Sequence, residues 1–471
     1  MKLKKLLPAM VVTSILAFGA TGCDNNQTDA NTLNIVCIKA SYGEEWINKI
    51  AEKFQETHEG VKVNITAIYE SESLISKNLA SKNNTDDLYI SVGSNWKYNA
   101  ASGQFLELDD LLNETVDGVS VKDKVADEYK DSIYFTKSNG EKKCYRLPFV
   151  SAIGGIFYNT KMFEANGWKV PTTYNELVEL CDTINSSKVI VAGDPDGTTT
   201  VKPFIYTGTN TDYFDYTVFD WWAQLAGKDA IQEFLKYESA DNFDVSKNST
   251  YNSLKTATSK WQGLFNSSKG YYVPDTNNMT AGQAQKQFIN GYAAMMFNGD
   301  WLYNDSLSYT NNGTYNDTFQ LGIMKTPVLE EAKAEYANTS YIIGEDQYIA
   351  IPKTSKHSAL AKDFIKAIIS DDGCQTFTDY AHGFLAYKAD VKTNNDIFLN
   401  SIIDLRKQYT TKFTNFSSNR KYLCNLVDIW STGGNRPFSS LLNGSKTIDV
   451  AFNDIASTAK ANWASWTKTS N

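Results

Sequence analysis

Residues 145–176, YRLPFVSAIGGIFYNTKMFEANGWKVPTTYNE, decide how the rest of this 471-residue chain is arranged. A short apolar strand ends at Pro148, which lacks the backbone N–H that a sheet ladder needs, and a second strand begins near Gly154. Between them, residues 150–152 are too small and too polar for a sheet interior. We interpret this segment as a crossing between two lobes.

The crossing is followed by two predicted helices. The first carries Met162 and Phe163 and ends at Gly167. Thr173 and Glu176 have the three-residue spacing of a capping box, so a second helix is expected to begin there.

Two stretches of the chain resemble the extracellular sugar-binding proteins of ABC importers, the maltose-binding-protein-like group. Residues 288–302, FINGYAAMMFNGDWL, resemble that family's helix, glycine turn, buried strand and Gly-x-Trp. Tyr174 stands where the family's hinge signature more often has Trp. The hinge signature is matched by Pro148, Gly155-Ile156-Phe157-Tyr158-Asn159, Met162-Phe163, Gly167, Pro171-Thr172-Thr173-Tyr174 and Glu176.

The resemblance covers nearly the whole mature chain. It implies an α/β, two-lobed periplasmic-binding-protein-like class II fold, whose discontinuous lobes are joined by hinge crossings. Two further crossings are predicted, at residues 341–351 and 383–387. The predicted boundaries are residues 33–149 and 344–385 for lobe 1, and residues 150–343 and 386–471 for lobe 2.

Residues 1–22 have the form of a bacterial lipoprotein signal peptide. Three lysines precede an apolar run at residues 6–20, and small residues lead to Cys23. We expect cleavage before Cys23, lipidation of that cysteine and a polar tether over residues 23–32. An ordinary signal peptide followed by a chance cysteine stays the alternative.

The composition excludes several classes of site. A net charge of −9 argues against binding to nucleic acid. Three scattered histidines, and five further cysteines without CxxC spacing, give no metal or cofactor site. Cys37, Cys144 and Cys424 lie in apolar runs and are expected to be buried thiols, although one disulfide stays open.

The first lobe brings polar and aromatic loops to one sheet edge. A strand at residues 33–38, a helix and a strand at residues 61–67 predict a right-handed crossover with parallel strands. Ligands of such sheets bind beyond the carboxyl ends of the strands. Tyr42 follows the first of these strands, and Asn95 and Trp96 follow a third.

The second lobe and the crossings supply the other candidates. Trp301 stands at a strand end after Gly299, where it either stacks on a ligand or packs beneath its loop. Residues 345–347 at the second crossing either bind ligand or are solvated. The resemblance and the loop positions together give these candidate ligand residues: Tyr42, Asn95, Trp96, Ser151, Asp212, Tyr213, Asp300, Trp301 and Trp430.

These residues suit a sugar, because aromatic rings bind its apolar faces and polar side chains bind its hydroxyls. We hypothesise a monomeric lipoprotein on the outer face of the cell membrane, on a Gram-positive-like surface. It would deliver a carbohydrate, an oligosaccharide by expectation, to an ABC permease without being an enzyme.

Two alternatives stay open. Carboxylates at Glu45, Asp212 and Asp300 could hold a cation such as a polyamine in the same fold. A secreted carbohydrate-active enzyme would need a pair of carboxyl groups about 5–10 Å apart, and nothing in the sequence singles out such a pair.

Overall fold

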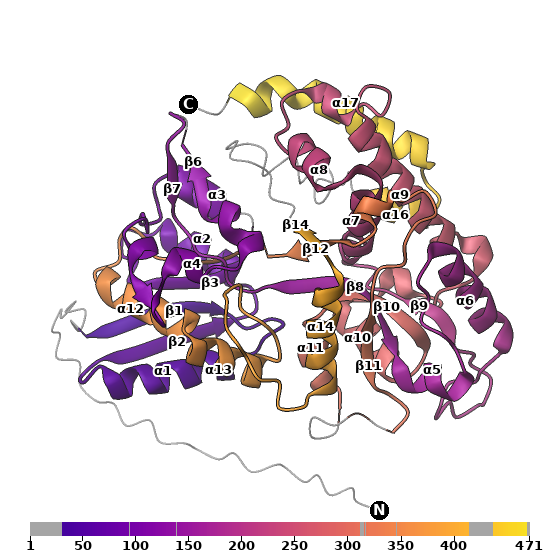
Figure 1. Ribbon diagram of the computed structural model, residues 1–471, viewed down its shortest axis with the longest axis horizontal. Coiled ribbons are helices and arrows are strands. Elements are labelled where there is room, and N and C mark those ends of the chain that lie inside the picture. Colours follow the sequence, from indigo (N-terminus) through magenta and orange to yellow (C-terminus); the bar gives the residue numbers. More distant parts are fainter. Residues whose placement is uncertain are drawn as a thin grey trace, which may run out of the picture.

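The computed structural model describes residues 31–93, 95–137, 139–310, 315, 317–344, 346–413 and 437–468, with side chains to Ala464. Two α/β halves lie on either side of the strands that link them (Figure 1). We call the half built on the sheet β13-β3-β1-β2 the first lobe, and the half built on the larger sheet the second lobe. The predicted residues Cys23, Cys424 and Trp430 lie outside the described residues.

The first-lobe sheet follows the predicted crossover. Strand β1 runs parallel to both β2 and β3, whereas β13 returns from the second lobe and pairs antiparallel to β3. The strands are β1 (Thr32–Ile38), β2 (Lys62–Ile68), β3 (Leu88–Val92) and β13 (Gln347–Ala350).

Helices cover this sheet through apolar stripes. In α1, Trp46, Ile50 and Phe54 recur at helical spacing and are buried against α12 and α13. The first-lobe helices are α1 (Glu45–Thr57), α2 (Ser71–Leu79), α3 (Asn95–Ala101), α4 (Val121–Lys124), α12 (Ser358–Ile369) and α13 (Asp371–Ala381). Two hairpins complete the lobe: β4 (Thr115–Val116) with β5 (Val119–Ser120), and β6 (Tyr134–Thr136) with β7 (Lys142–Cys144).

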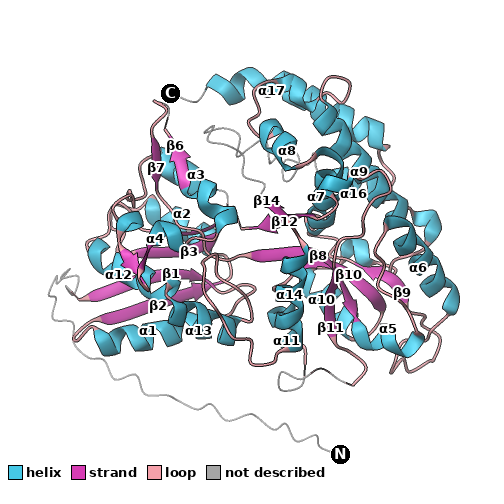
Figure 2. Ribbon diagram, in the orientation of Figure 1, coloured by secondary structure: helices cyan, strands magenta, loops and turns pink. Residues whose placement is uncertain are grey.

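The second-lobe sheet is arranged around β8, which pairs antiparallel with β10, β11 and β12 (Figure 2). The outer strands β9 and β14 run parallel to β10 and β12 respectively. The strands are β8 (Ala152–Asn159), β9 (Lys202–Ile205), β10 (Ala293–Gly299), β11 (Leu321–Met324), β12 (Thr339–Ile343) and β14 (Thr411–Phe413).

Local sequence signals place the helices of this lobe. The predicted capping box at Thr173 and Glu176 is confirmed, and Gly167 ends the preceding helix with a positive φ of 66°. The helices are α5 (Thr160–Asn166), α6 (Tyr174–Ser187), α7 (Tyr213–Ala226), α8 (Lys228–Phe234), α9 (Ser249–Phe265), α10 (Ala281–Ile289), α11 (Leu302–Leu307), α14 (Ile397–Gln408), α16 (Pro437–Leu442) and α17 (Ile448–Lys468).

Strand β8 has two different faces. Ala152 and Ile156 belong to the large hydrophobic cluster that includes α7, whereas Ile153 and Phe157 belong to a second cluster with residues of α14. Successive side chains of a strand point to opposite sides, so α7 and α14 cover opposite faces of the sheet. We call these the α7 face and the α14 face.

Three segments connect the lobes. The first passes from Leu147, which pairs with Ile349 of β13, into β8, and the second passes from β12 into β13. Strand β8 begins at Ala152, two residues earlier than the predicted Gly154, because Ala152 pairs with Ile343 of β12.

The third connection lies later in the chain than predicted. The N–H of Lys388 donates to the Lys124 carbonyl at 2.7 Å, and the N–H of Lys392 donates to Gln375 at 2.8 Å. Residues 386–392 therefore lie against the first lobe, and the predicted boundary after Leu385 is too early. The chain rejoins the second lobe at α14.

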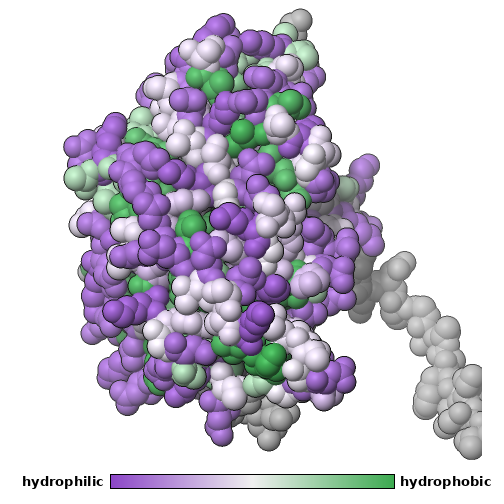
Figure 3. Space-filling view, turned by 90° about the vertical axis from the view of Figure 1, so that its right-hand side faces the viewer, coloured by the Kyte–Doolittle hydropathy of each residue, from purple (hydrophilic) through white to green (hydrophobic). Residues whose placement is uncertain are grey.

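The surface of the second lobe is mostly hydrophilic, with apolar residues scattered between polar ones (Figure 3). Within the described ranges, no helix has the length and apolar character needed to span a membrane. Cys37, Cys144, Cys181 and Cys374 are buried free thiols, as the sequence predicted for the first two.

Candidate ligand-binding cleft

Two glycines make room for aromatic rings on the α7 face. Gly154 of β8 and Gly299 of β10 are directly paired across the sheet. A Cβ atom on Gly154 would lie 2.3 Å from the Tyr216 ring, and one on Gly299 would lie 2.3 Å from the Trp301 ring. The sheet can hold these rings only because both positions lack a side chain.

Tyr213 completes this aromatic cluster. Its ring stacks on Tyr216 at 5.8 Å between centroids and meets Trp301 edge-on at 5.9 Å. Tyr216 also stacks on Tyr341 of β12 at 6.4 Å. Tyr213 and Tyr216 are three residues apart in the first turn of α7, so they share a side of the helix. The helix thus presents both rings beside the end of β10, together with the half-buried Asp212.

Tyr42 stands on the first-lobe side, in the loop after β1. It is only 3 % exposed and packs against Phe149 at 6.0 Å and Phe377 at 5.4 Å. Its hydroxyl has no hydrogen-bond partner among the described residues. Burial raises the pKa of Tyr42, and the carboxylates of Asp300, Asp305 and Asp346 add to this effect. The hydroxyl therefore faces acidic groups from the rest of the protein.

Asn95 and Trp96 are neighbours in sequence but differ in exposure to solvent. Asn95 is exposed at the start of α3, whereas Trp96 is 1 % exposed in the first-lobe core. The Arg146 guanidinium lies 4.5 Å from the centre of the Trp96 ring. Since burial and Arg146 cover this ring, we leave Trp96 out of the candidate site.

Asp346 occupies the second crossing, between β12 and β13. Its carbonyl accepts a hydrogen bond from the Gly93 N–H at 2.8 Å, whereas its Oδ1 atom is buried with no partner among the described residues. Burial raises the pKa of Asp346; Asp212 raises it further, and Arg146 and Lys97 lower it. Groups from both lobes thus act on this carboxylate.

Ser151 and Asp300 lie toward the α14 face instead. Arg406 of α14 donates to the Ser151 carbonyl at 2.5 Å and lies 3.6 Å from an Asp300 carboxylate oxygen. The same carboxylate accepts the Ile153 N–H at 3.2 Å. Burial raises the pKa of Asp300 to about 6, against the lowering effect of Arg406. These partners give Asp300 a structural role at the crossing, in place of the ligand contact that the sequence suggested.

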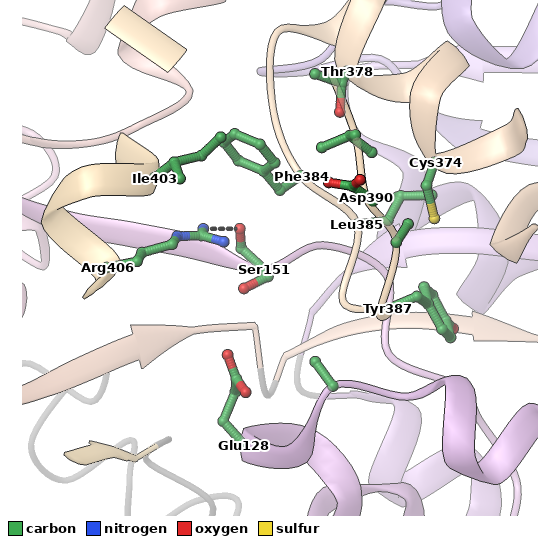
Figure 4. A pocket seen from close by; sticks show the side chains of 13 residues that line it. Glu128, Ser151, Cys374, Thr378, Phe384, Leu385, Tyr387, Asp390, Ile403 and Arg406 are labelled. Atoms are coloured by element: carbon green, nitrogen blue, oxygen red, sulfur yellow. Dashed lines mark hydrogen bonds between the residues drawn. The ribbon is translucent and has the colours of Figure 1, made fainter. Parts of the chain in front are cut away.

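A cavity of about 300 Å³ opens beside this arginine (Figure 4). Arg406 and Ile403 line it from the second lobe, and Glu128, Cys374 and Asp390 line it from first-lobe elements and the connection after them. Its only residue in common with the sequence candidates is Ser151. The cavity is therefore a hinge feature, separate from the aromatic cluster.

Helix α11, directly after Trp301, contacts the first lobe at two consecutive residues. The Asn304 amide donates to the Ser41 carbonyl at 2.9 Å, and the Tyr303 ring meets the His382 ring at 5.3 Å. Ser41 and His382 have positive φ angles of 69° and 52°, which are uncommon for residues other than glycine. The first-lobe backbone is thus shaped to meet α11.

The structure brings Tyr213 and Trp301 into contact beside Asp212, and the charge of Asp300 acts on the Tyr42 hydroxyl. Trp96 lies apart, in the first-lobe core. Sequence reasoning missed Tyr216 and Arg406. The three-residue spacing from Tyr213 could have indicated Tyr216, whereas no local pattern pointed to Arg406. Among the described side chains, no group of three His, Cys, Asp or Glu residues could hold a metal ion.

Comparison with known proteins gives one family. The model of the bacterial extracellular solute-binding proteins matches residues 40–373. A curated relative, the diacetylchitobiose binding protein NgcE of Streptomyces coelicolor, is 21% identical over 351 residues, which are 74% of this chain and 68% of the relative.

Solved structures share the fold. A chitin oligosaccharide binding protein superposes with a TM-score of 0.65 at 16% identity, covering 91% of this chain and 98% of its own. The apo form of RafE from Streptococcus pneumoniae gives a TM-score of 0.65 at 17% identity, covering 90% and 96% respectively. RafE is also solved in complex with raffinose.

Proposed function

Because the chain belongs to the bacterial extracellular solute-binding protein family, we propose that its ligand is a carbohydrate, an oligosaccharide by preference, which it delivers to an ABC permease. The family consists of exported binding proteins, not enzymes. The relatives named above bind diacetylchitobiose, chitin oligosaccharides and raffinose, which supports a sugar.

One observation carries the proposal: the aromatic cluster of Tyr213, Tyr216 and Trp301 beside Asp212 at the end of β10. Aromatic rings bind the apolar faces of sugars, and carboxylates accept hydrogen bonds from sugar hydroxyls. The paired glycines beneath the rings fit a site that must hold flat surfaces in fixed positions.

Charge balance disfavours the polyamine alternative. Arg406 lies beside Asp300, and Arg146 and Lys97 act on Asp346, so protein cations already oppose these carboxylates. Glu45, which the sequence grouped with Asp212 and Asp300, is exposed at the start of α1. A polycation would have to displace these cations from their partners.

An enzymatic role is disfavoured by the state of Asp300. Its carboxylate accepts a backbone N–H and lies beside Arg406, so it is poorly placed to exchange protons with a substrate.

We further propose that Cys23 carries the lipid that holds the protein at the outer face of the cell membrane, as on a Gram-positive surface. In this arrangement the chain acts as a monomer, and lobe closure over the ligand presents one form to the permease.

Calorimetric titration of the purified chain tests the proposal. Neutral oligosaccharides such as diacetylchitobiose, raffinose and maltotriose are the probes, with spermidine as the control and chromatography of the mixture to detect hydrolysis. We expect saturable binding of one sugar class without cleavage. Binding of spermidine alone, or release of shorter sugars, would overturn it.

A further inference from the structure

Two buried polar atoms, one in the loop after β1 and one at the second crossing, have no hydrogen-bond partner among the described residues. They are the Tyr42 hydroxyl and the Asp346 Oδ1 atom. Buried polar atoms in proteins nearly always have a partner, because leaving one unbonded costs the free energy of its lost hydration. Each of these two atoms is therefore available to a molecule that supplies the missing hydrogen bond.

Hydrogen bonds hold the backbone on both sides of Asp346 and at Asp346 itself. Gly344, two residues before it, has a φ of 137°, and a Cβ atom there would lie 2.7 Å from the Val150 carbonyl. The Gln347 N–H donates to the Gly344 carbonyl at 3.2 Å, and the Gly93 N–H donates to the Asp346 carbonyl at 2.8 Å. The second crossing is thus tied to the first crossing and to the end of β3.

The charges around Tyr42 and Asp346 favour a ligand that donates hydrogen bonds. The carboxylates of Asp300, Asp305 and Asp346 all act on the Tyr42 hydroxyl. Asp212 of the second lobe acts on Asp346, opposed by Arg146 and Lys97 of the first. Ionised carboxylates only accept hydrogen bonds, so a ligand that approaches Asp346 must supply O–H or N–H groups.

We propose that Asp346 is a specificity-determining residue of the cleft: with the Tyr42 hydroxyl, it binds hydroxyl or amide N–H groups of a neutral sugar and rejects acidic sugars. This inference rests on the proposed function. A uronate or a phosphorylated sugar would bring a second negative charge to Asp346 and Asp212, and like charges at short range repel.

Asp220 of α7 is a matched contrast. Asp220 is fully buried, whereas Asp346 is half-buried with a buried Oδ1 atom. Thr326 donates to one oxygen of Asp220 at 2.5 Å and the Tyr341 N–H donates to the other at 2.5 Å. In Asp220→Asn, an NH2 group replaces one of two oxygens that accept hydrogen bonds, so it meets a donor in place of an acceptor. Replacing Asp346 by Asn instead removes a buried charge whose Oδ1 has no partner among the described residues.

The test compares the wild-type chain with Asp346→Asn and Asp220→Asn. Thermal melts without ligand are followed by calorimetry with diacetylchitobiose, raffinose, maltotriose and trigalacturonate. We expect Asp346→Asn to raise the ligand-free Tm by a few degrees and to weaken the neutral sugar at least tenfold, while the preference over trigalacturonate shrinks. Asp220→Asn should lower Tm and leave affinity within twofold.

Two results would overturn the inference: a lower ligand-free Tm in Asp346→Asn, or an affinity for the bound sugar within twofold of wild type. Failure of the wild-type chain to bind any neutral probe would instead count against the proposed function. The thermal melts would then test Asp346 without ligand. A higher Tm in Asp346→Asn would support a carboxylate without a hydrogen-bond partner, and a lower Tm would refute it.

Discussion

On the α7 face of β8, bare glycine backbone lies under the rings of Tyr216 and Trp301, while on the α14 face Arg406 binds Ser151 and lies beside Asp300. The first face is rich in flat apolar surface. The second consists of polar groups that bond one another. Both faces belong to the same strand and lie within a few residues of the same crossing.

This contrast separates two tasks. A ring can bind a ligand only where a surface stays available to it, whereas the hinge needs groups that are bonded in the protein alone. Because both lobes line the cavity beside Arg406, a rotation of the lobes changes its shape (Figure 4). Variants on the α7 face should therefore change binding, and variants on the α14 face should change stability and lobe motion.

The largest effect is expected for Trp301→Ala. Trp301 is 8 % exposed, so the truncation should cost about 3–5 kcal/mol of folding free energy. Sugar binding should weaken by about 1–2 kcal/mol, because the half-buried Tyr213 loses the ring against which it packs. Denaturant unfolding and calorimetry measure the two quantities. The control is Trp168→Ala, at a half-buried tryptophan after α5, which should leave the sugar affinity unchanged. A similar loss of sugar affinity in this variant would contradict the assignment of binding to the α7 face.

The next effect concerns the α14 face. Arg406→Met removes the donor to Ser151 and leaves Asp300 without its cation, which should destabilise the fold by about 2–4 kcal/mol. Lys407→Met is the matched control, because Lys407 is exposed and its one ion pair among the described residues is with Asp404 at 3.0 Å. Its loss should change stability by less than about 0.5 kcal/mol. Equal effects of both variants would contradict the assignment of Arg406 to the hinge.

A third prediction uses one buried carboxyl on each face. Burial raises the pKa of Asp220 to about 7 and that of Asp300 to about 6 from 3.8. A raised pKa in the folded state means that each group favours folding when protonated, and that this contribution is lost as pH rises through about 6 to 7. Because the unfolded carboxyls ionise near 3.8, the loss accumulates below these values, and between pH 4.5 and 8 each group should change stability by about 2–3 kcal/mol.

Urea unfolding from pH 4.5 to 8 measures this slope. In Asp220→Asn the fall in stability between pH 6 and 7 should disappear, and in Asp300→Asn the fall between pH 4.5 and 6 should become shallower. An unchanged slope in both variants would show that neither carboxyl carries a raised pKa.

The smallest effect is expected for Asn304→Ala at the contact between the lobes. Loss of one neutral hydrogen bond to the Ser41 carbonyl should weaken sugar binding by about 1 kcal/mol, roughly fivefold, mainly through faster dissociation. Ligand-free stability should stay the same. Asn166→Ala, which removes a bond within α5, is the control, and stopped-flow dissociation is the measurement. A slower dissociation in Asn304→Ala would mean that the contact opposes closure.

Much of the fold was predictable because its signals are local. The capping box at Thr173, the glycine that ends α5 and the apolar alternation of β2 each depend on neighbouring residues. The third crossing was placed too early because residues 386–392 are held to the first lobe by Lys124 and Gln375, which lie far from them in sequence or in another element.

The candidate site was predictable only in part. Trp301 and Tyr213 stand beside turns and helix starts that the sequence marks, so they could be named in advance. Trp96 has the same local features, yet it is buried beneath Arg146, which is 50 positions away. Burial depends on which distant segments pack over a ring, and a local pattern does not contain that information.

The sequence by itself determined the first β-α-β crossover, the crossing after Pro148 and the family, because periodicity, caps and turn residues act over a few positions. The tertiary structure alone decided that Asp300 is bound by Arg406 at the hinge and that the charge of Asp212 acts on Asp346. These pairings join segments far apart in the chain, and their free energy depends on burial and distance, which only the folded arrangement fixes.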